Sequence, residues 1–329
     1  MLNEVDIKEN DILKYDTLLL ETLLIDRNKP QGKGSFGHII WGTDAYINRG
    51  KGYRVQDEIT VGAISGKHGS VIKPRVVKSK TEQAYRIKDK AEVFTPSWIC
   101  NKQNNLIDDA WFGIKDVFNT EIDKGWQTNK SNISFPTKDG KTWIDYIKDT
   151  RLEVSCGEAP YLVSRYDAIT GKPIPVNERI GLLDRKLRVV SENVHSEQEW
   201  IEYAILAVKS IYGYEWQGDN LLLARENVLF TFVDFYNDFF GKIPQIEILR
   251  EVAEVISWNL WQMDGLRGVI PYSCKNIVTE EYDLFEGCTK TVIKCEGCEK
   301  GDLNRHNGVY CKIKDWETGG IVRFVSMIK

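Results

Sequence analysis

Three acidic residues stand near the ends of predicted strands. Glu153 belongs to the strand that runs into Ser155-Cys156-Gly157, Glu215 closes the strand Tyr212–Glu215, and Asp264 follows the strand that begins near Asn259. The carboxyl ends of parallel strands meet at one edge of a sheet, and α/β proteins bind nucleotides there through carboxylates that accept hydrogen bonds from ribose hydroxyls. Each acid alone reads as a helix cap or a turn residue, but their order predicts a nucleotide-type cofactor site.

The loop after the first of these strands has the composition of a ligand-binding turn. Ser155, Cys156 and Gly157 are small, and Gly157 lets a ligand approach the backbone closely. We expect a helix to follow the small residues, and its N-terminus would favour a negatively charged ligand group. Such a turn is weak evidence by itself.

Four segments resemble a known family. Glu92-Val93-Phe94-Thr95-Pro96 resembles the EVFTP signature that precedes the cofactor loop in the adenine-N6 DNA methyltransferases of restriction–modification systems. LEVSCGEAPYL, YGYEWQGDNLLLAREN and NLWQMDGL resemble that family's first, second and third motifs. The four occur in the family's order and span roughly residues 90–270. The resemblance implies a Rossmann-like fold and binding of S-adenosylmethionine.

The resemblance also implies a role for individual residues. Thr95 and its neighbours would border the methionine end of the cofactor, Glu153 would lie near the methionine amino group, and Gly157 would permit close backbone approach. Glu215 would bind the ribose and Asp264 the adenine amino group. The full set implied for the cofactor is Phe94, Thr95, Pro96, Glu153, Ser155, Gly157, Glu215, Trp216 and Asp264.

The chain departs from the family most at the catalytic motif. Val154 and Ala159 replace a usual proline and glycine, and an insertion around 168–200 lengthens the path to Glu215. More seriously, the family's Asn/Asp/Ser-Pro-Pro-aromatic tetrapeptide, which grips the flipped adenine, is missing: none of the nine prolines are adjacent. Val269-Ile270-Pro271-Tyr272 has no amide or acid before its proline and is not accepted as a copy.

We therefore predict no catalytic residue in this chain. The favoured hypothesis is an S-adenosylmethionine-binding methyltransferase subunit that is inactive alone. A partner would supply the Asn/Asp-Pro-Pro-Tyr motif and target recognition, and would carry most of the DNA contact. The alternatives are a non-catalytic methyltransferase-fold scaffold or anti-restriction protein, and a zinc-stabilised DNA-binding module with a vestigial cofactor site.

The cysteines cluster near the end of the chain. Five of the seven lie between Cys274 and Cys311, and Cys295-x-x-Cys298 has the spacing of a metal knuckle. Cys288, Cys295, Cys298 and Cys311 are the predicted ligands of a structural zinc ion, with Cys274 or His306 able to replace one; free thiols are the alternative. We expect loss of this zinc to leave cofactor binding largely intact.

The remaining pattern predicts an α/β fold with a mainly parallel sheet. Helices are predicted within 15–26, within 168–195 after a turn, at the start of 200–216, over 219–240 and at the start of 246–266, with strands ending the segments 200–216 and 246–266. We expect an N-terminal region with short strands and a basic helix (1–90), a methyltransferase-like domain (91–272) and a cysteine-rich segment (273–329). The basic stretch 72–90 and the cluster Asp184-Arg185-Lys186 are interpreted as solvated helix surfaces.

Charge and hydropathy exclude some classes of protein. The net charge of −4 gives no global attraction to nucleic acid, so DNA contact needs a local patch or a partner. No apolar run approaches the roughly 20 residues that span a bilayer. The acidic, polar N-terminus is unlike a signal peptide, which predicts a cytoplasmic protein without a membrane partner.

Overall fold

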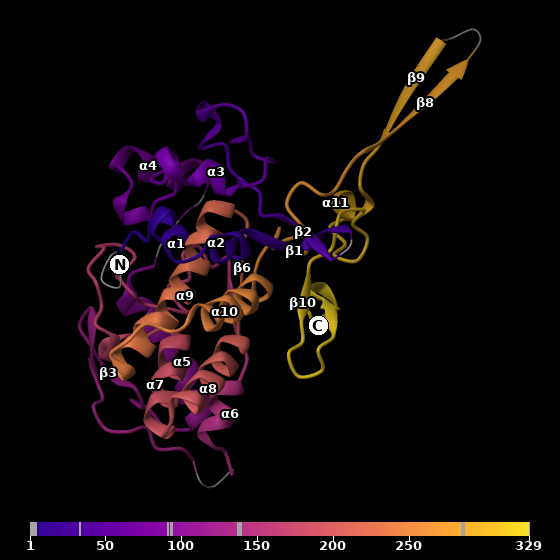
Figure 1. Cartoon of the computed structure of the whole chain (residues 1–329). Coiled ribbons are helices and arrows are strands. Elements are labelled where there is room, and N and C mark those ends of the chain that lie inside the picture. The colour runs from indigo at the N-terminus through magenta and orange to yellow at the C-terminus, as the bar shows by residue number, and fades with distance from the viewer. Residues whose placement is uncertain are drawn as a thin grey trace.

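A computed structural model describes residues 5–32, 34–90, 92, 95–136, 140–283 and 287–328, with only the backbone described at 89–90, 281–283 and 287–290. Figure 1 shows a body built mainly of helices, from which a C-terminal part extends to one side. The fold is mixed α/β, as predicted, and its parallel sheet has three strands in the described chain.

The N-terminal region contains two short strands and the basic helix α4 (Lys80–Lys90). Its elements are α1 (Glu9–Tyr15), α2 (Thr17–Leu24), β1 (Ile25–Gly32), β2 (Ser35–His38), α3 (Val61–Ile64) and α4. Helix α2 buries Leu19, Leu20, Leu23 and Leu24, and it packs on α10 (Ile246–Asn259). These leucines belong to the same hydrophobic core as the central helices.

The sheet that positions the cofactor candidates runs in the order β5-β6-β7. Its strands are β5 (Arg151–Val154), β6 (Ile211–Glu215) and β7 (Leu260–Gln262), all parallel, with Glu153 opposite Gly213 and Glu215 opposite Gln262. Helices α7 (Leu182–Asn193) and α8 (Glu197–Lys209) connect β5 to β6, and α9 (Gly218–Phe240) and α10 connect β6 to β7. This alternation confirms the predicted helix–strand units.

Helix α9 is the centre of the body. Residues 218–236 are all buried, and the helix ends at Gly241, whose φ of 68° is left-handed and costs a glycine nothing. Arg225 lies inside and donates hydrogen bonds to the carbonyls of Leu23, Ile25 and Leu260. Burial lowers the pKa of Arg225 to about 10. Its five donors thus join α9, β7 and the N-terminal region.

A second group of elements packs against α7 and α8. It comprises α5 (Ser97–Phe112), β3 (Asn119–Ile122), β4 (Gly125–Thr128) and α6 (Trp143–Lys148). Here the prediction of a solvated cluster at Asp184–Lys186 is wrong, because all three side chains are about 1% exposed. Arg185 donates to Asp108 at 2.5 Å, and Lys186 donates to the Ile147 carbonyl at 3.1 Å. These hydrogen bonds offset part of the cost of burying the polar groups, and burial still lowers the pKa of Lys186 well below its usual range.

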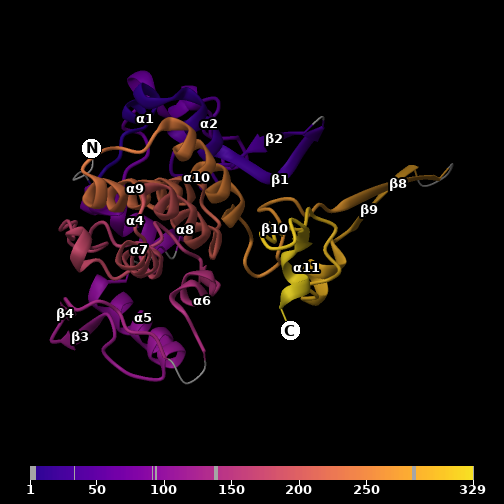
Figure 2. The same cartoon turned by 60° about the horizontal axis from the view of Figure 1, so that its bottom comes forward.

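The C-terminal part has little helix. It contains β8 (Ile277–Asp283), β9 (Gly287–Ile293), α11 (Glu296–Lys300), β10 (Lys312–Lys314) and β11 (Ile321–Arg323). Figures 1 and 2 both show the β8–β9 hairpin projecting away from the body. A small apolar cluster that includes Trp261, Ile270 and Phe324 joins this part to the sheet.

One predicted element is absent. No helix follows Gly157: between β5 and α7 the chain forms turns and one short 3-10 helix, Val176–Glu178. Positive φ angles at Ser155 (49°), Gly157 (54°) and Ala159 (63°) are incompatible with an α-helix, and Pro160 removes a backbone donor.

Every helix in the described residues is too short or too polar to cross a membrane.

Candidate functional site

A cavity of about 570 Å³ lies at the carboxyl ends of β5 and β6. Its size is in the range of small-molecule sites, about 300–1,000 Å³. The strand ends and the loops that follow them contribute most of its wall. The lining residues are Gly42, Glu92, Thr95, Glu153, Val154, Ser155, Cys156, Gly157, Pro160, Tyr161, Glu215, Trp216, Gln217, Asn220 and Tyr272.

Glu215 sits between the two loops of this cavity. Its carboxylate accepts hydrogen bonds from the backbone N–H of Gly157 at 2.9 Å and of Gln217 at 3.0 Å. Burial raises the pKa of Glu215, although these backbone donors oppose the shift. Each carboxylate oxygen has two lone pairs, so both can still accept a bond from a ligand hydroxyl. The loop after β5 is thereby fixed to the end of β6.

Glu153 faces the same cavity from β5. Its oxygens accept from the backbone N–H of Tyr161 (3.3 Å) and of Leu162 (3.1 Å), which folds the loop back over the strand. Burial raises the pKa of Glu153 to about 8, and the nearby Glu215 adds to the rise. A cationic ligand group beside Glu153 would favour its ionised form.

Asp264 lies outside the set of described residues that line the cavity. It is two residues beyond β7, where its carboxylate accepts from the Leu266 N–H at 3.1 Å and pairs with Arg267 at 3.3 Å. The end of β7 instead carries Gln262, which bonds the Ile40 N–H and the Ile40 and Trp216 carbonyls, each at 2.8 Å. The third strand end is occupied by the N-terminal region rather than by a ligand-facing acid.

The other predicted cofactor residues divide between two places. Thr95, Ser155, Gly157 and Trp216 line the cavity. Pro96 precedes α5 and lines a separate hollow with Trp98 and Asp167. Phe94 lies outside the described residues.

The N-terminal region closes the cavity on one side. Trp216 donates from its indole N–H to the Gly42 carbonyl at 2.9 Å, and Gly218 donates its N–H to the Trp41 carbonyl at 2.9 Å. Gly42 has a φ of 65°, and a Cβ there would lie 2.5 Å from the Trp216 carbonyl oxygen. Only glycine permits this approach.

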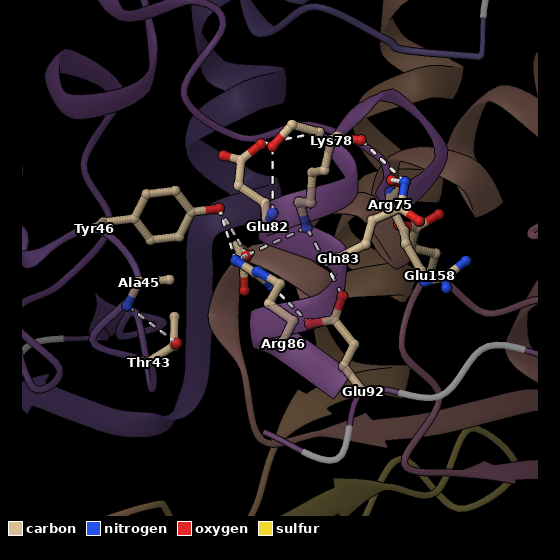
Figure 3. A network of polar contacts seen from close by, with 12 residues as sticks. Thr43, Ala45, Tyr46, Arg75, Lys78, Glu82, Gln83, Arg86, Glu92 and Glu158 are labelled. Carbon is tan, nitrogen blue, oxygen red and sulfur yellow. Dashed lines mark hydrogen bonds and ion pairs between the residues drawn. The ribbon is translucent and has the colours of Figure 1, made fainter. Parts of the chain in front are cut away.

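A buried ion-pair network, shown in Figure 3, adjoins the cavity through Glu92, which also lines it. Arg86 of the basic helix pairs with Glu92 at 2.7 Å and with Asp219 in the first turn of α9. Tyr46 donates to Asp219 at 2.8 Å, and Lys78 lies 3.9 Å from it. Burial would raise the pKa of Asp219, but Arg86 and Lys78 outweigh it, so the pKa is lowered.

This network modifies the interpretation of the basic stretch. Most described side chains of α4 are exposed, as predicted, but Lys78 and Arg86 are buried. They bind the N-terminal region to α9, whose first turn carries the cavity residue Asn220. Asn220 Oδ1 and Gln217 Oε1 are buried without a hydrogen-bond partner among the described residues. Buried polar atoms of this kind are costly unless a ligand or water bonds them.

A second candidate site, a metal centre, lies in the C-terminal part. Cys274, Cys295, Cys298 and His306 place their ligand atoms within 4.8 Å of one another. The three sulfurs lie 3.6, 3.7 and 3.6 Å from His306 Nδ1. Zinc–sulfur and zinc–nitrogen bonds of about 2.3 and 2.05 Å at tetrahedral angles give a sulfur–nitrogen separation of about 3.6 Å. The group can therefore hold a metal ion such as zinc.

The surroundings of this group fit closely around the four side chains. A Cβ at Gly308 would lie 2.9 Å from the Cys274 sulfur, and one at Gly297 would lie 2.7 Å from His306 Nδ1. The Asn307 N–H donates to the Cys295 sulfur at 3.3 Å. Burial opposes ionisation of Cys295, but such backbone donors lower its pKa to about 6, toward the thiolate form that binds metals.

One of the predicted ligands lies elsewhere, and the group contains both alternatives that the sequence left open. Cys311 lies in the apolar cluster beside Trp261, fully buried, with its thiol directed to the Gln262 carbonyl at 3.4 Å. Cys288 belongs to β9, and its side chain lies outside what the structure describes. Cys274 and His306 complete the group instead. Cys100 and Cys156 are buried, as core thiols should be.

Sequence reasoning missed several cavity residues. Gly42, Gln217, Asn220 and Tyr272 line it without belonging to the predicted set. A signal existed for two of them, because Gln217 and Asn220 lie within the segment that resembles the second motif. Gly42 and Tyr272 carried none, since their contacts depend on segments far away in the chain.

No family model, curated protein or solved structure matches this chain. The function is therefore inferred from the residues and their geometry.

Proposed function

We propose that this chain binds S-adenosylmethionine and serves as the cofactor-binding subunit of an adenine-N6 DNA methyltransferase of the restriction–modification type. The observation that supports this most is the position of Glu215: it ends a parallel strand, lines the cavity and keeps acceptor capacity toward it. The order of the motif-like segments adds to it.

The cavity residues fit this cofactor. Glu215 can accept hydrogen bonds from the ribose hydroxyls. Glu153, when ionised, can form an ion pair with the ammonium group of the methionine part. Asn220 and Gln217 have buried oxygens without described partners beside the cavity. When bound, the cofactor would supply an activated methyl group. The chain's own contribution is to bind and orient it.

Asp264 has no part in this proposal as a direct ligand. Its carboxylate is engaged by Leu266 and Arg267, so the adenine amino group would need another acceptor. Gln217 and Asn220, whose side-chain oxygens have no described hydrogen-bond partner, are the candidates within the cavity wall.

The proposal includes a partner subunit that carries the missing Asn/Asp-Pro-Pro-Tyr motif. Strand β5 is paired only with β6 among the described residues, so its outer edge is free. Leu152 and Val154 on this strand are 45% and 60% exposed. A free strand edge with apolar side chains is a ready surface for another chain. It adjoins the cofactor cavity, which Val154 also lines.

Titration calorimetry with S-adenosylmethionine and S-adenosylhomocysteine tests the cofactor. We expect micromolar affinity, on the order of −8 kcal/mol. Glu215→Ala should weaken binding by about 1–3 kcal/mol, because it removes charge-assisted bonds. Glu247→Ala, an exposed acid on α10, is the matched control and should bind as wild type does. Absence of heat and of a thermal shift at millimolar cofactor would refute the site.

Co-expression tests the partner. The chain alone should not methylate plasmid DNA, whereas co-expression with a gene product carrying the Asn/Asp-Pro-Pro-Tyr element should restore adenine methylation. Methylation by the single chain would show that other residues hold the base. Tight cofactor binding without activity in any such combination would favour the scaffold or anti-restriction alternative.

A further inference from the structure

Tyr272 and Trp216 form an aromatic pair at the cofactor cavity. Both line it, and their ring centroids are 5.3 Å apart at an interplanar angle of 77°. Tyr272 is 42% exposed, so much of its ring surface is available. Trp216 directly follows Glu215, the residue proposed to bind the ribose.

Tyr272 has a backbone conformation that is unusual for a residue with a bulky side chain, and this conformation sets the position of its ring. Ser273 donates its N–H to the Ile270 carbonyl at 3.1 Å, with Pro271 and Tyr272 between them. Tyr272 has a φ of 62°. This is the third position of a type II turn, which glycine or asparagine normally fills. A bulky residue there costs about 1–2 kcal/mol, and such outliers concentrate at functional sites.

The metal centre lies directly beside this turn. Cys274, a candidate ligand, is two residues beyond Tyr272. The turn is also bound to the segment that follows the ligand His306: Ile270 donates to the Val309 carbonyl at 2.8 Å, and Val309 donates to Ser273 Oγ at 3.0 Å. The turn is therefore joined on one side to the candidate ligand Cys274 and on the other to Val309, three residues after the candidate ligand His306.

We infer that the metal centre holds Tyr272 in its strained conformation, so that its exposed ring, with Trp216 packed edge to face against it, contacts the purine ring of the ligand. The identity of the ligand rests on the proposed function. This coupling differs from the expectation that cofactor binding is independent of the cysteine-rich segment. Tyr272 acts as a binding residue, and the metal ligands position it.

The chemistry favours a purine that is joined to a ribose. A ribose held by Glu215 places its base beside the next residue, Trp216. Aromatic side chains stack on nucleobases through their ring faces and contribute about 1–3 kcal/mol per base. An adenine flipped from DNA presents the same ring, so the experiment has an arm for each source.

The test measures binding to purified protein that retains its metal, by calorimetry and tryptophan fluorescence. S-adenosylhomocysteine, adenosine and a DNA duplex with one unpaired adenine are the probes. Tyr272→Phe should bind S-adenosylhomocysteine as wild type does. Tyr272→Asn, which tolerates positive φ, should bind about tenfold more weakly with an unchanged or higher melting temperature. Tyr15→Asn, at a similarly exposed tyrosine, is the control.

Removal of the metal completes a thermodynamic cycle. Metal-free wild type should lose about tenfold in affinity, and metal-free Tyr272→Asn should lose little beyond the effect of its substitution, because both changes remove the same ring. Unchanged binding by Tyr272→Asn, or by metal-free wild type, would overturn the inference. An effect of Tyr272→Asn on the DNA duplex alone would overturn the assignment of the ring to the cofactor.

The same data separate this inference from the proposed function. If adenosine binds through Tyr272 but S-adenosylhomocysteine does not bind, the aromatic contact stands and the methyltransferase proposal fails. If S-adenosylhomocysteine binds equally to wild type and Tyr272→Asn, the proposal stands and the aromatic contact fails. If no probe binds, both are wrong.

Discussion

The cofactor cavity and the metal centre are built on opposite physical principles. The cavity rests on α9, where residues 218–236 are all buried, and on a core that extends from Ile7 to Leu260. Between 274 and 310, by contrast, Cys295, Gly297 and His306 are the buried residues among those whose side chains are described. The first site is shaped by packed side chains, whereas the second has no apolar core to hold it.

The two sites therefore need different sources of free energy in order to form. Burial of apolar surface stabilises the cavity walls whether or not a ligand is bound. A loop-rich segment that buries so little cannot offset its loss of conformational entropy without a further source of free energy. Metal ligation by four side chains can supply that source.

Removal of the metal should cause the largest loss of structure. The loss should be confined to the cysteine-rich segment. Structural zinc contributes roughly 10–16 kcal/mol in small zinc-binding peptides, so the cysteine-rich segment should unfold without it. Purified protein should contain about one zinc per chain. Hydrogen exchange after chelation should show lost protection at residues 295–311 and unchanged protection in α9. Equal loss in both regions would contradict this prediction.

Two cysteine variants sharpen the assignment of ligands. Cys298→Ser should abolish stoichiometric zinc, because it removes one of four ligands. Cys311→Ser should keep the zinc and cost about 1–2 kcal/mol, since it places a hydroxyl in an apolar cluster. Zinc loss in both variants would favour the ligand set first predicted from the sequence, which contains Cys298 and Cys311.

Disruption of the buried ion-pair network should cause the next largest loss of stability. This loss should be confined to the helical body of the protein. Asp219→Ala leaves Arg86 and Lys78 buried beside the remaining Glu92, and loss of one partner of a buried pair costs about 3–5 kcal/mol. Chemical denaturation with metal bound measures the loss. Asp11→Ala is the control: it breaks the exposed pair with Lys14 and should cost no more than about 1 kcal/mol. Similar costs for both variants would refute a stabilising network.

The smallest effect concerns the protonation of Glu153. Its pKa is raised to about 8 in the ligand-free protein, so most chains carry a neutral Glu153 at pH 6. A bound ammonium group would lower that pKa and release a proton on binding. Affinity for S-adenosylhomocysteine should therefore rise with pH between about 6 and 8, by at most about tenfold per pH unit. Calorimetry in buffers of different ionisation enthalpy measures the released proton.

Glu153→Gln is the variant that isolates this effect. It should bind more weakly at pH 8 and show a flatter dependence on pH. Since a raised pKa favours the protonated folded state, wild type should also lose stability as pH rises from about 4.5 to 8. That contribution should be missing from the variant. A wild-type affinity independent of pH would place the ammonium group elsewhere.

Local sequence was sufficient to predict the elements that carry the sites. The apolar pattern and Gly241 predicted α9 and its end, and the strands at Glu153 and Glu215 were found because short apolar runs meet small or acidic residues there. The Cys295–Cys298 spacing predicted a metal knuckle because such a turn needs only four residues. These features depend on neighbours in the chain, so they could be predicted from the sequence.

The tertiary structure decided which distant residues meet. Gln262 rather than Asp264 occupies the end of β7 because its amide bonds Ile40, more than 200 residues away. Cys274 joins the metal group while Cys311 is buried against Trp261, although both flank the same knuckle. Arg86 is buried where its pattern indicated a solvated face, because Asp219 lies opposite it. Each outcome depends on the packing of segments whose meeting no local pattern encodes, since side-chain partners at long separation are set by the path of the whole chain.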